Sequence, residues 1–97
     1  MTITINNKDY TFSYAGFGAQ YIYETITGEV FTGASTRNLH LLMYSALLNG
    51  NGDSFAMSIT EFTDWLYEHP AEEEAMAQAI FAEASRRQAL REPKKKE

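Results

Sequence analysis

The stretch "STRNLHLLMYSALLNG", residues 35–50, decides the fold of this 97-residue chain. Its apolar side chains recur at every third or fourth position, which is the spacing of one helical face. They are Leu39, Leu42, Met43, Ala46 and Leu47. Ser35 or Thr36 can cap the start of this helix, and Gly50 can close its end. The stretch therefore predicts an amphipathic helix over residues 36–49, whose apolar face other elements must cover.

The segment after this helix carries alternating Asn and Asp residues, as a calcium-binding loop does, but the spacing does not fit. Such a loop needs glycine at its sixth position and glutamate at its twelfth. Counting from Asn49 places Ser54 and Thr60 at those two positions. Counting back from Glu61 instead places glycines at positions 1 and 3, where oxygen ligands belong. We therefore expect no calcium site here and a polar helix-to-helix connection over residues 49–56.

A capping box accounts for the end of the same segment. In "SITE", residues 58–61, the Ser58 side chain can accept from the backbone of Glu61 while the Glu61 side chain reaches back. This predicts a third helix near residues 59–68, which stops before Pro70 because the residue before a proline resists the helical conformation. Its expected inward residues are Ile59, Phe62, Trp65 and Leu66.

A fourth helix is predicted near residues 71–90. The acidic run 72–74 lies close to its start and Arg86, Arg87 and Arg91 lie close to its end, as the helix dipole favours. Its expected inward residues are Ala77, Ile80, Phe81 and Ala84, with Met76 beside them.

Upstream, "TITINNKDYTFSY", residues 2–14, alternates as the strands of a β-hairpin do. A two-residue turn at Asn6–Asn7 sets Ile3 opposite Tyr10, and Asn tolerates the positive φ that this turn needs. One face of the hairpin then carries Ile3, Ile5, Tyr10 and Phe12. A first helix over residues 17–27 follows, closed by Gly28 in the left-handed conformation. Its expected inward residues are Ala19, Ile22, Tyr23 and Ile26.

These elements predict a mainly helical α+β fold of four helices with an N-terminal β-hairpin. We expect one domain over residues 1–91, with the hairpin in residues 1–14, and a disordered basic tail over residues 92–97. The absence of cysteine excludes disulfides, cysteine nucleophiles and thiolate metal sites. No apolar run approaches the roughly 18 residues of a membrane span, and the N-terminus lacks the pattern of a signal peptide. We therefore expect a soluble cytoplasmic protein with no membrane partner.

Charge is unevenly distributed along the chain. Residues 1–84 hold eleven acidic and two basic residues, Lys8 and Arg37, a net charge of −9. Residues 85–97 hold six basic and two acidic residues, a net charge of +4. Because binding to a phosphate backbone needs a basic face, this acidic body is a poor nucleic-acid partner. Only the C-terminal tail has a suitable charge.

Few residues could carry catalysis or hold a cofactor. His40 and His69 lack the H-x-x-x-H spacing of a metal site, and we expect both to be solvated. Gly16 and Gly18 precede a helix as in a dinucleotide-binding loop, but the third glycine is missing, so a sharp turn explains them better. The acidic run 72–74 fits a helix start better than a metal site. We therefore expect no enzymatic activity, no catalytic residue, no metal and no cofactor.

Three tyrosines remain as candidate partner-binding residues. Tyr21, Tyr44 and Tyr67 fall off the apolar stripes of their predicted helices. Tyrosine is enriched at protein interfaces because it joins an apolar ring to a polar tip. The alternative is that these rings pack at the edges of the core or against the hairpin.

The order of these parts resembles that of the tail assembly chaperones of long-tailed bacteriophages. After a short extended N-terminus, the first helix ends in "YETITGEVF", similar to the recurring aromatic–acid–x–x–T–G step of that family. A leucine-rich helix, "NLHLLMYSALLNG", and a short capped helix, "SITEFTDWL", follow. The long charged segment "AEEEAMAQAIFAEASRRQ" comes next, so the likeness covers most of the chain.

The resemblance implies a non-enzymatic role in virion assembly. Such chaperones bind the tape-measure protein and help tail-tube subunits polymerise around it, so it implies both proteins as partners and leaves self-association open. They act in the host cytoplasm and are absent from the finished virion. Many are made in two lengths, and this chain resembles the short form. The lysines of "PKKKE" fit a slippery run of adenines where a frameshifted product departs, or simply a basic solvated tail.

A second function class stays open. The chain could be a small helical adaptor or regulator that binds protein or nucleic acid through its basic C-terminus. Salt distinguishes the two classes, because phosphate binding weakens steeply as salt rises and an apolar contact does not.

Overall fold

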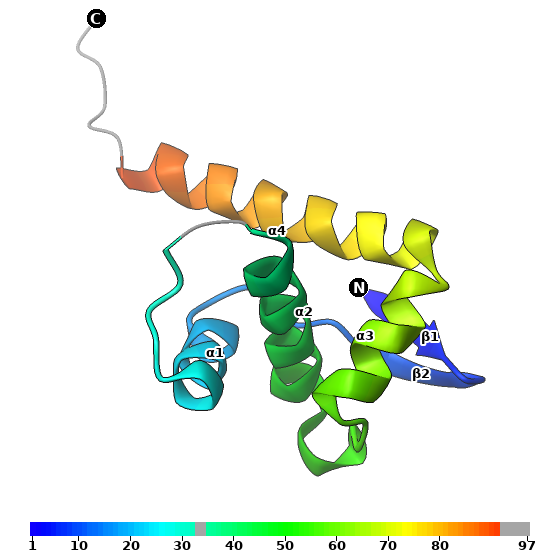
Figure 1. The fold of residues 1–97 in the computed structure, drawn as a ribbon. Helices are drawn as coiled ribbons and strands as arrows, with labels where there is room; N and C mark the ends of the chain where they lie inside the picture. The colour runs from blue at the N-terminus through cyan, green and yellow to red at the C-terminus, as the bar shows by residue number, and fades with distance from the viewer. Residues whose placement is uncertain (33–34, 92–97) are drawn as a thin grey trace, which may run out of the picture.

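The computed structural model describes residues 1–32 and 35–91 and has the predicted mainly helical α+β fold (Figure 1). The described part contains strands β1 (Thr2–Ile5) and β2 (Lys8–Thr11), helices α1 (Gly18–Thr27), α2 (Thr36–Asn51), α3 (Ile59–Tyr67) and α4 (Pro70–Arg91), and a 3-10 turn η1 (Gly52–Ser54). The tail predicted over residues 92–97 lies outside the described residues.

Helix α2 is the central element of the fold. Helix α1 packs along one side of it and α3 along the other, while α4 crosses the ends of α2 and α3 (Figure 1). Strand β2 contacts α2 as well. One hydrophobic core joins side chains from the hairpin and from all four of these helices. Leu42 and Leu66 both lie in this core, as predicted.

The hairpin has the predicted register. Ile3 pairs with Tyr10 and Ile5 with Lys8 across an antiparallel pair of strands. Asn6 and Asn7 form the turn with φ of 52° and 67°, the left-handed region that a two-residue hairpin turn requires. On the predicted inner face Ile3, Ile5 and Phe12 are buried and Tyr10 is partly buried.

Two asparagine side chains fix the hairpin to α2. The Asn51 carboxamide accepts from the Thr11 backbone N–H at 3.0 Å and donates to the Thr11 carbonyl at 2.9 Å, as an adjacent strand would. The Asn49 carboxamide donates to the Ser13 carbonyl at 3.0 Å. These asparagines, which resemble ligands of a calcium loop in the sequence, thus join two elements of the fold.

The prediction that Gly50 ends the helix is wrong. Helix α2 continues to Asn51, and Gly52 follows it with a φ of 61°. The first three residues of the predicted polar connection over 49–56 therefore belong to α2, and the side chains of two of them, Asn49 and Asn51, bond the hairpin. A Cβ at Gly50 would collide with the carbonyl oxygen of Thr11. Glycine at this position lets the hairpin backbone approach the helix closely.

The local signals at the other helix ends are confirmed. The Ser58 hydroxyl accepts from Glu61 N–H at 3.1 Å, and the Glu61 carboxylate accepts from Ser58 N–H at 2.9 Å, which completes the capping box. The Ser35 hydroxyl caps α2 by accepting from Asn38 N–H at 3.2 Å. Gly28 closes α1 with a φ of 70°. Each contact spans only a few residues, which is why the sequence reveals it.

Three residues expected in the core lie on the surface. Ile26 on α1 is 39% exposed, Phe81 on α4 is 48% exposed, and Ala84 on α4 is exposed. Helix α1 packs chiefly on α2, so it buries only Ala19 and Tyr23. Helix α4 crosses the bundle and buries only Met76 and Ile80, both in its first half. The periodic stripes of these helices are therefore longer than the surfaces available to cover them.

Candidate partner-binding surfaces

Tyr44 is not a surface residue, and its assignment to a partner-binding surface is wrong. Its side chain is only 9% exposed, and its hydroxyl donates to the Met57 carbonyl at 2.5 Å. Its ring packs with those of Phe55 and Phe62, at centroid distances of 5.4 and 5.7 Å. Burial, and to a smaller extent the charge of Glu61, raises the pKa of the Tyr44 hydroxyl above its ordinary value. Tyr44 therefore helps to hold the core together.

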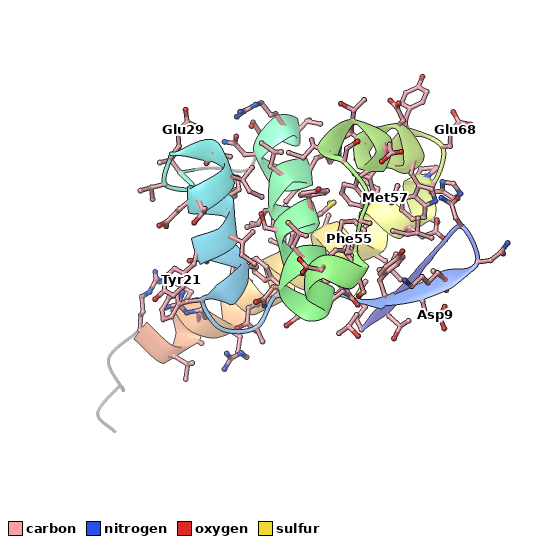
Figure 2. All side chains as sticks on the ribbon, turned by 90° about the horizontal axis from the view of Figure 1, so that it is seen from below. Asp9, Tyr21, Glu29, Phe55, Met57 and Glu68 are labelled. Atoms are coloured by element: carbon pink, nitrogen blue, oxygen red, sulfur yellow. The ribbon has the colours of Figure 1, made fainter. Side chains whose placement is uncertain are left out.

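Tyr21 and Tyr67 are exposed, but they do not share a surface. Their exposed fractions are 61% and 84%. Tyr21 lies on α1 and Tyr67 on α3, on opposite sides of α2 (Figure 1). Figure 2 places Tyr21 and Glu68, the residue after Tyr67, at opposite ends of the molecule. A single surface built from the three predicted tyrosines thus does not form.

Tyr21 belongs to an exposed aromatic cluster that the sequence analysis missed. Its ring stacks on that of Phe17, with centroids 5.8 Å apart, and the Arg87 guanidinium lies 4.5 Å from the Phe17 ring centroid. Phe17 is itself about half exposed. We call Phe17, Tyr21 and Arg87 the Phe17 cluster. Phe17 and Tyr21 stand four residues apart and off the apolar stripe of their helix, which is the sequence signal that could have indicated it.

A cleft of about 370 Å³ lies beside this cluster. The lining includes Gln20 of α1, Val30 and Phe31 of the segment after α1, and Ala84 and Gln88 of α4. Val30 is largely exposed. In the same lining, Glu83 pairs with Arg86 at 2.8 Å. The hydrogen bond from Arg86 is the main reason that the pKa of Glu83 lies below its ordinary value.

An open groove of about 540 Å³ is lined by residues of α1, α2 and α3. Its apolar lining comes from Ile26 on α1, Leu41 on α2 and Ile59 on α3. Arg37 and His40 also line it. We call this site the Arg37 groove.

The two histidines are bonded within the fold, so the expectation that both are solvated is wrong. His40 Nε2 lies 2.5 Å from a carboxylate oxygen of Glu73 and links α2 to α4. His69 Nδ1 lies 2.7 Å from the Trp65 carbonyl, and its ring stacks on the Trp65 indole with centroids 4.3 Å apart. Both histidines have structural partners that the sequence pattern does not show.

Gly16, just before α1, and Gly18, the first residue of α1, both have structural roles. Gly16 has a φ of 83°, which suits glycine at a sharp turn. A Cβ at Gly18 would collide with the Asn49 side chain that bonds Ser13. The sheet of the described part is a two-stranded antiparallel pair, whereas a dinucleotide loop belongs to a parallel sheet.

Within residues 1–32 and 35–91, no group of three or more His, Asp or Glu side chains is placed to hold a metal ion. In the same residues, no helix has the combined length and apolarity of a membrane span. No family model, curated protein or solved structure matches this chain. The two exposed apolar sites, the Phe17 cluster with its cleft and the Arg37 groove, are therefore the features on which a function can be argued.

Proposed function

We propose that this protein is a tail assembly chaperone of a long-tailed bacteriophage, which holds helical segments of the tape-measure protein while the tail tube assembles. The proposal rests on the resemblance in the order of sequence parts. The observation that carries it is the exposed Phe17 cluster beside the cleft between α1 and the second half of α4.

The Phe17 cluster suits transient binding of an apolar helix face. Partner helices commonly place an apolar face in a groove, and a few aromatic or arginine anchors supply most of the binding energy. Phe17, Tyr21 and Arg87 supply these residue types at one place on the surface. The cluster is small enough to release a client again, as assembly requires, and the proposed role needs no catalytic group.

The charge of the body favours clients with basic flanks. With −9 over residues 1–84, the protein attracts a basic segment at long range, which speeds encounter more than it raises affinity. The same charge keeps the body away from nucleic acid.

Co-expression with the tape-measure protein of the same phage tests the proposal. Wild type should keep the client soluble. The double variant Phe17→Ala/Tyr21→Ala should lose that ability while its thermal melt stays close to that of wild type, because both residues are exposed and neither belongs to the buried core. Tyr67→Ala is the matched control, since it removes an exposed tyrosine ring from α3, which lies on the other side of α2 from α1 (Figure 1).

Two results would contradict the proposal. One concerns the surface that binds the client, and the other concerns the chaperone role itself. A double variant that solubilises the client as well as the Tyr67→Ala control does would show that the client binds elsewhere. A wild-type protein that does not bind the client would remove the chaperone assignment. Oligonucleotide binding that weakens steeply with salt would then favour the adaptor alternative.

A further inference from the structure

The apolar part of the Arg37 groove lining comes from three helices. Ile26, Leu41 and Ile59 come from α1, α2 and α3. Ile26 continues the apolar stripe of α1 beyond the buried Tyr23, yet 39% of its surface is left exposed by the described residues 1–32 and 35–91. An apolar side chain at such a place is available to a partner.

The polar side chains of the groove are occupied by bonds within the protein. The Thr27 hydroxyl donates to the Tyr23 carbonyl at 2.8 Å, and the Thr63 hydroxyl donates to the Ile59 carbonyl at 3.0 Å. His40 is bonded to Glu73. A small polar ligand would therefore find few free hydrogen-bonding groups here, whereas an apolar side chain would find a suitable surface.

Arg37 gives the groove a positive charge in an otherwise acidic body. It is one of two basic residues in residues 1–84, and the other, Lys8, lies on the hairpin. In the part of the chain that the structure describes, the ion pairs are His40–Glu73 and Glu83–Arg86, so no carboxylate there pairs with Arg37. Arg37 itself is exposed and bonds the neighbouring Asn38 side chain. Arg37 therefore supplies a cation at the groove with which a partner carboxylate can pair.

The secondary structure around the groove favours one conformation of a bound peptide. An extended peptide binds best along a free strand edge, where its main chain gains hydrogen bonds. The residues that line the Arg37 groove belong to helices α1, α2 and α3, and none of them belongs to a strand. An amphipathic helix fits such a surface, because it brings apolar side chains and needs no main-chain partner.

We propose that the Arg37 groove binds an amphipathic helix that carries a carboxylate next to its apolar stripe. The apolar residues lie on Ile26, Leu41 and Ile59, and the carboxylate pairs with Arg37. This inference deepens the proposed function, on which it rests for the identity of the client, by stating the chemistry that a client helix presents. Basic residues elsewhere on the client suit the acidic body, so one acidic position in a basic helix sets its register.

The test uses two synthetic helical peptides of about 18 residues, long enough to form a helix in water. Both carry leucines spaced i, i+3, i+4 and i+7, and they differ only in having Glu or Lys beside that stripe. Binding to the full-length protein is measured by fluorescence anisotropy at low salt. The Glu peptide should bind wild type more tightly than the Lys peptide does.

Reversing the charge of Arg37 tests whether this residue contacts the carboxylate of the peptide. Arg37→Glu should weaken the Glu peptide by roughly five- to tenfold and restore binding of the Lys peptide, since one charge pair is inverted. Lys8→Glu is the matched control: it makes the same change of net charge on the hairpin and should alter either affinity by less than about twofold. Ile26→Ser should weaken both peptides alike. Thermal melts confirm that each variant is folded.

Several outcomes would overturn the inference. The first is that neither peptide binds. The second is that Arg37→Glu and Lys8→Glu have equal effects. The third is that the Phe17→Ala/Tyr21→Ala variant alone abolishes peptide binding. Binding of dodecanoate in place of the peptides would assign the groove to a small amphiphilic carboxylate instead. A client that stays soluble with Arg37→Glu would leave the chaperone role intact without this groove. Peptides that bind as expected, with no binding of the tape-measure protein, would leave the groove intact without that role.

Discussion

Seven successive residues of α2, Leu41–Leu47, are buried, although a helix that packs on one side buries only every third or fourth residue. The reason is that α2 contacts α1, α3, α4 and β2. Polar side chains in this run are tolerated because each finds an acceptor. The Tyr44 hydroxyl donates to Met57, and the Ser45 hydroxyl donates to the Leu41 carbonyl at 2.8 Å. For the burial of a residue in this run, it matters more that α2 is the central helix than whether the residue belongs to the apolar stripe.

Leu42→Ala should therefore destabilise the protein strongly. Leu42 is fully buried, and truncating such a side chain leaves a cavity that costs about 2–5 kcal/mol. That is a large share of the stability of a small domain. Urea unfolding followed by circular dichroism measures the change, and Leu66→Ala should behave in the same way. Leu90→Ala is the matched control, because the same atoms are removed from an exposed position. If Leu42→Ala and Leu66→Ala both stayed within about 0.5 kcal/mol of wild type, the assignment of the core would be wrong.

At the scale of elements, the contact between α2 and β2 is polar at its edge and apolar inside. The hairpin buries Ile3, Ile5 and Phe12, but a two-stranded hairpin is marginal without support. Asn51 supplies this support at Thr11, where it satisfies both the N–H and the carbonyl of one residue. Gly50 permits the approach because it has no side chain. The same short segment thus ends a helix and bonds the backbone of the last residue of β2.

Asn51→Ala should loosen the hairpin before it unfolds the bundle. The change removes two hydrogen bonds to Thr11 and one to the Leu47 carbonyl, with an expected total cost of about 1–3 kcal/mol. Hydrogen exchange measured by NMR should show faster exchange of the β2 amides than of the α2 amides. Gln78→Ala is the matched control, because the Gln78 amide donates only to Glu74 on its own helix. Unchanged protection of β2 would mean that apolar contacts alone hold the hairpin.

The two halves of helix α4 differ in how much they contribute to the core. Its first half contributes Met76 and Ile80 to the core, while none of its residues 81–91 is buried. The second half is supported by the Glu83–Arg86 pair and by the contact between Arg87 and Phe17. Exposed pairs of this kind contribute little to stability. This half of α4 is therefore better suited to meeting a partner than to holding the fold.

At the scale of the whole molecule, the core and the candidate surfaces occupy different parts of the chain. The core contains residues from Ile3 to Ile80, whereas Arg87 of the Phe17 cluster lies beyond it. The charges divide similarly, with the basic residues of α4 in its last two turns and its acidic run at its start. Folding and partner binding can consequently be altered by separate substitutions.

Removal of residues 92–97 should leave the fold intact. The core formed by the described residues ends at Ile80, so the free energy of unfolding of residues 1–91 should stay within about 0.5 kcal/mol of that of the full chain. Paired urea melts of the two proteins measure this difference. Because the Phe17 cluster is retained, the shortened protein should also keep its client soluble. A clear loss of stability would place the tail among the residues that hold the fold.

The sequence by itself determined the order of the elements, the Asn6–Asn7 turn, the Ser58–Glu61 capping box and the Gly28 helix end. Each depends on residues at most a few positions apart, so local backbone chemistry is sufficient. Only the tertiary structure decided that Tyr44 is buried, that Ile26 and Phe81 stay exposed, and that Asn51 meets Thr11 forty positions away. Burial depends on which elements cover a face, and that is settled by contacts between distant segments. The Phe17 cluster and the Arg37 groove belong to this second kind, since each gathers side chains from separate helices.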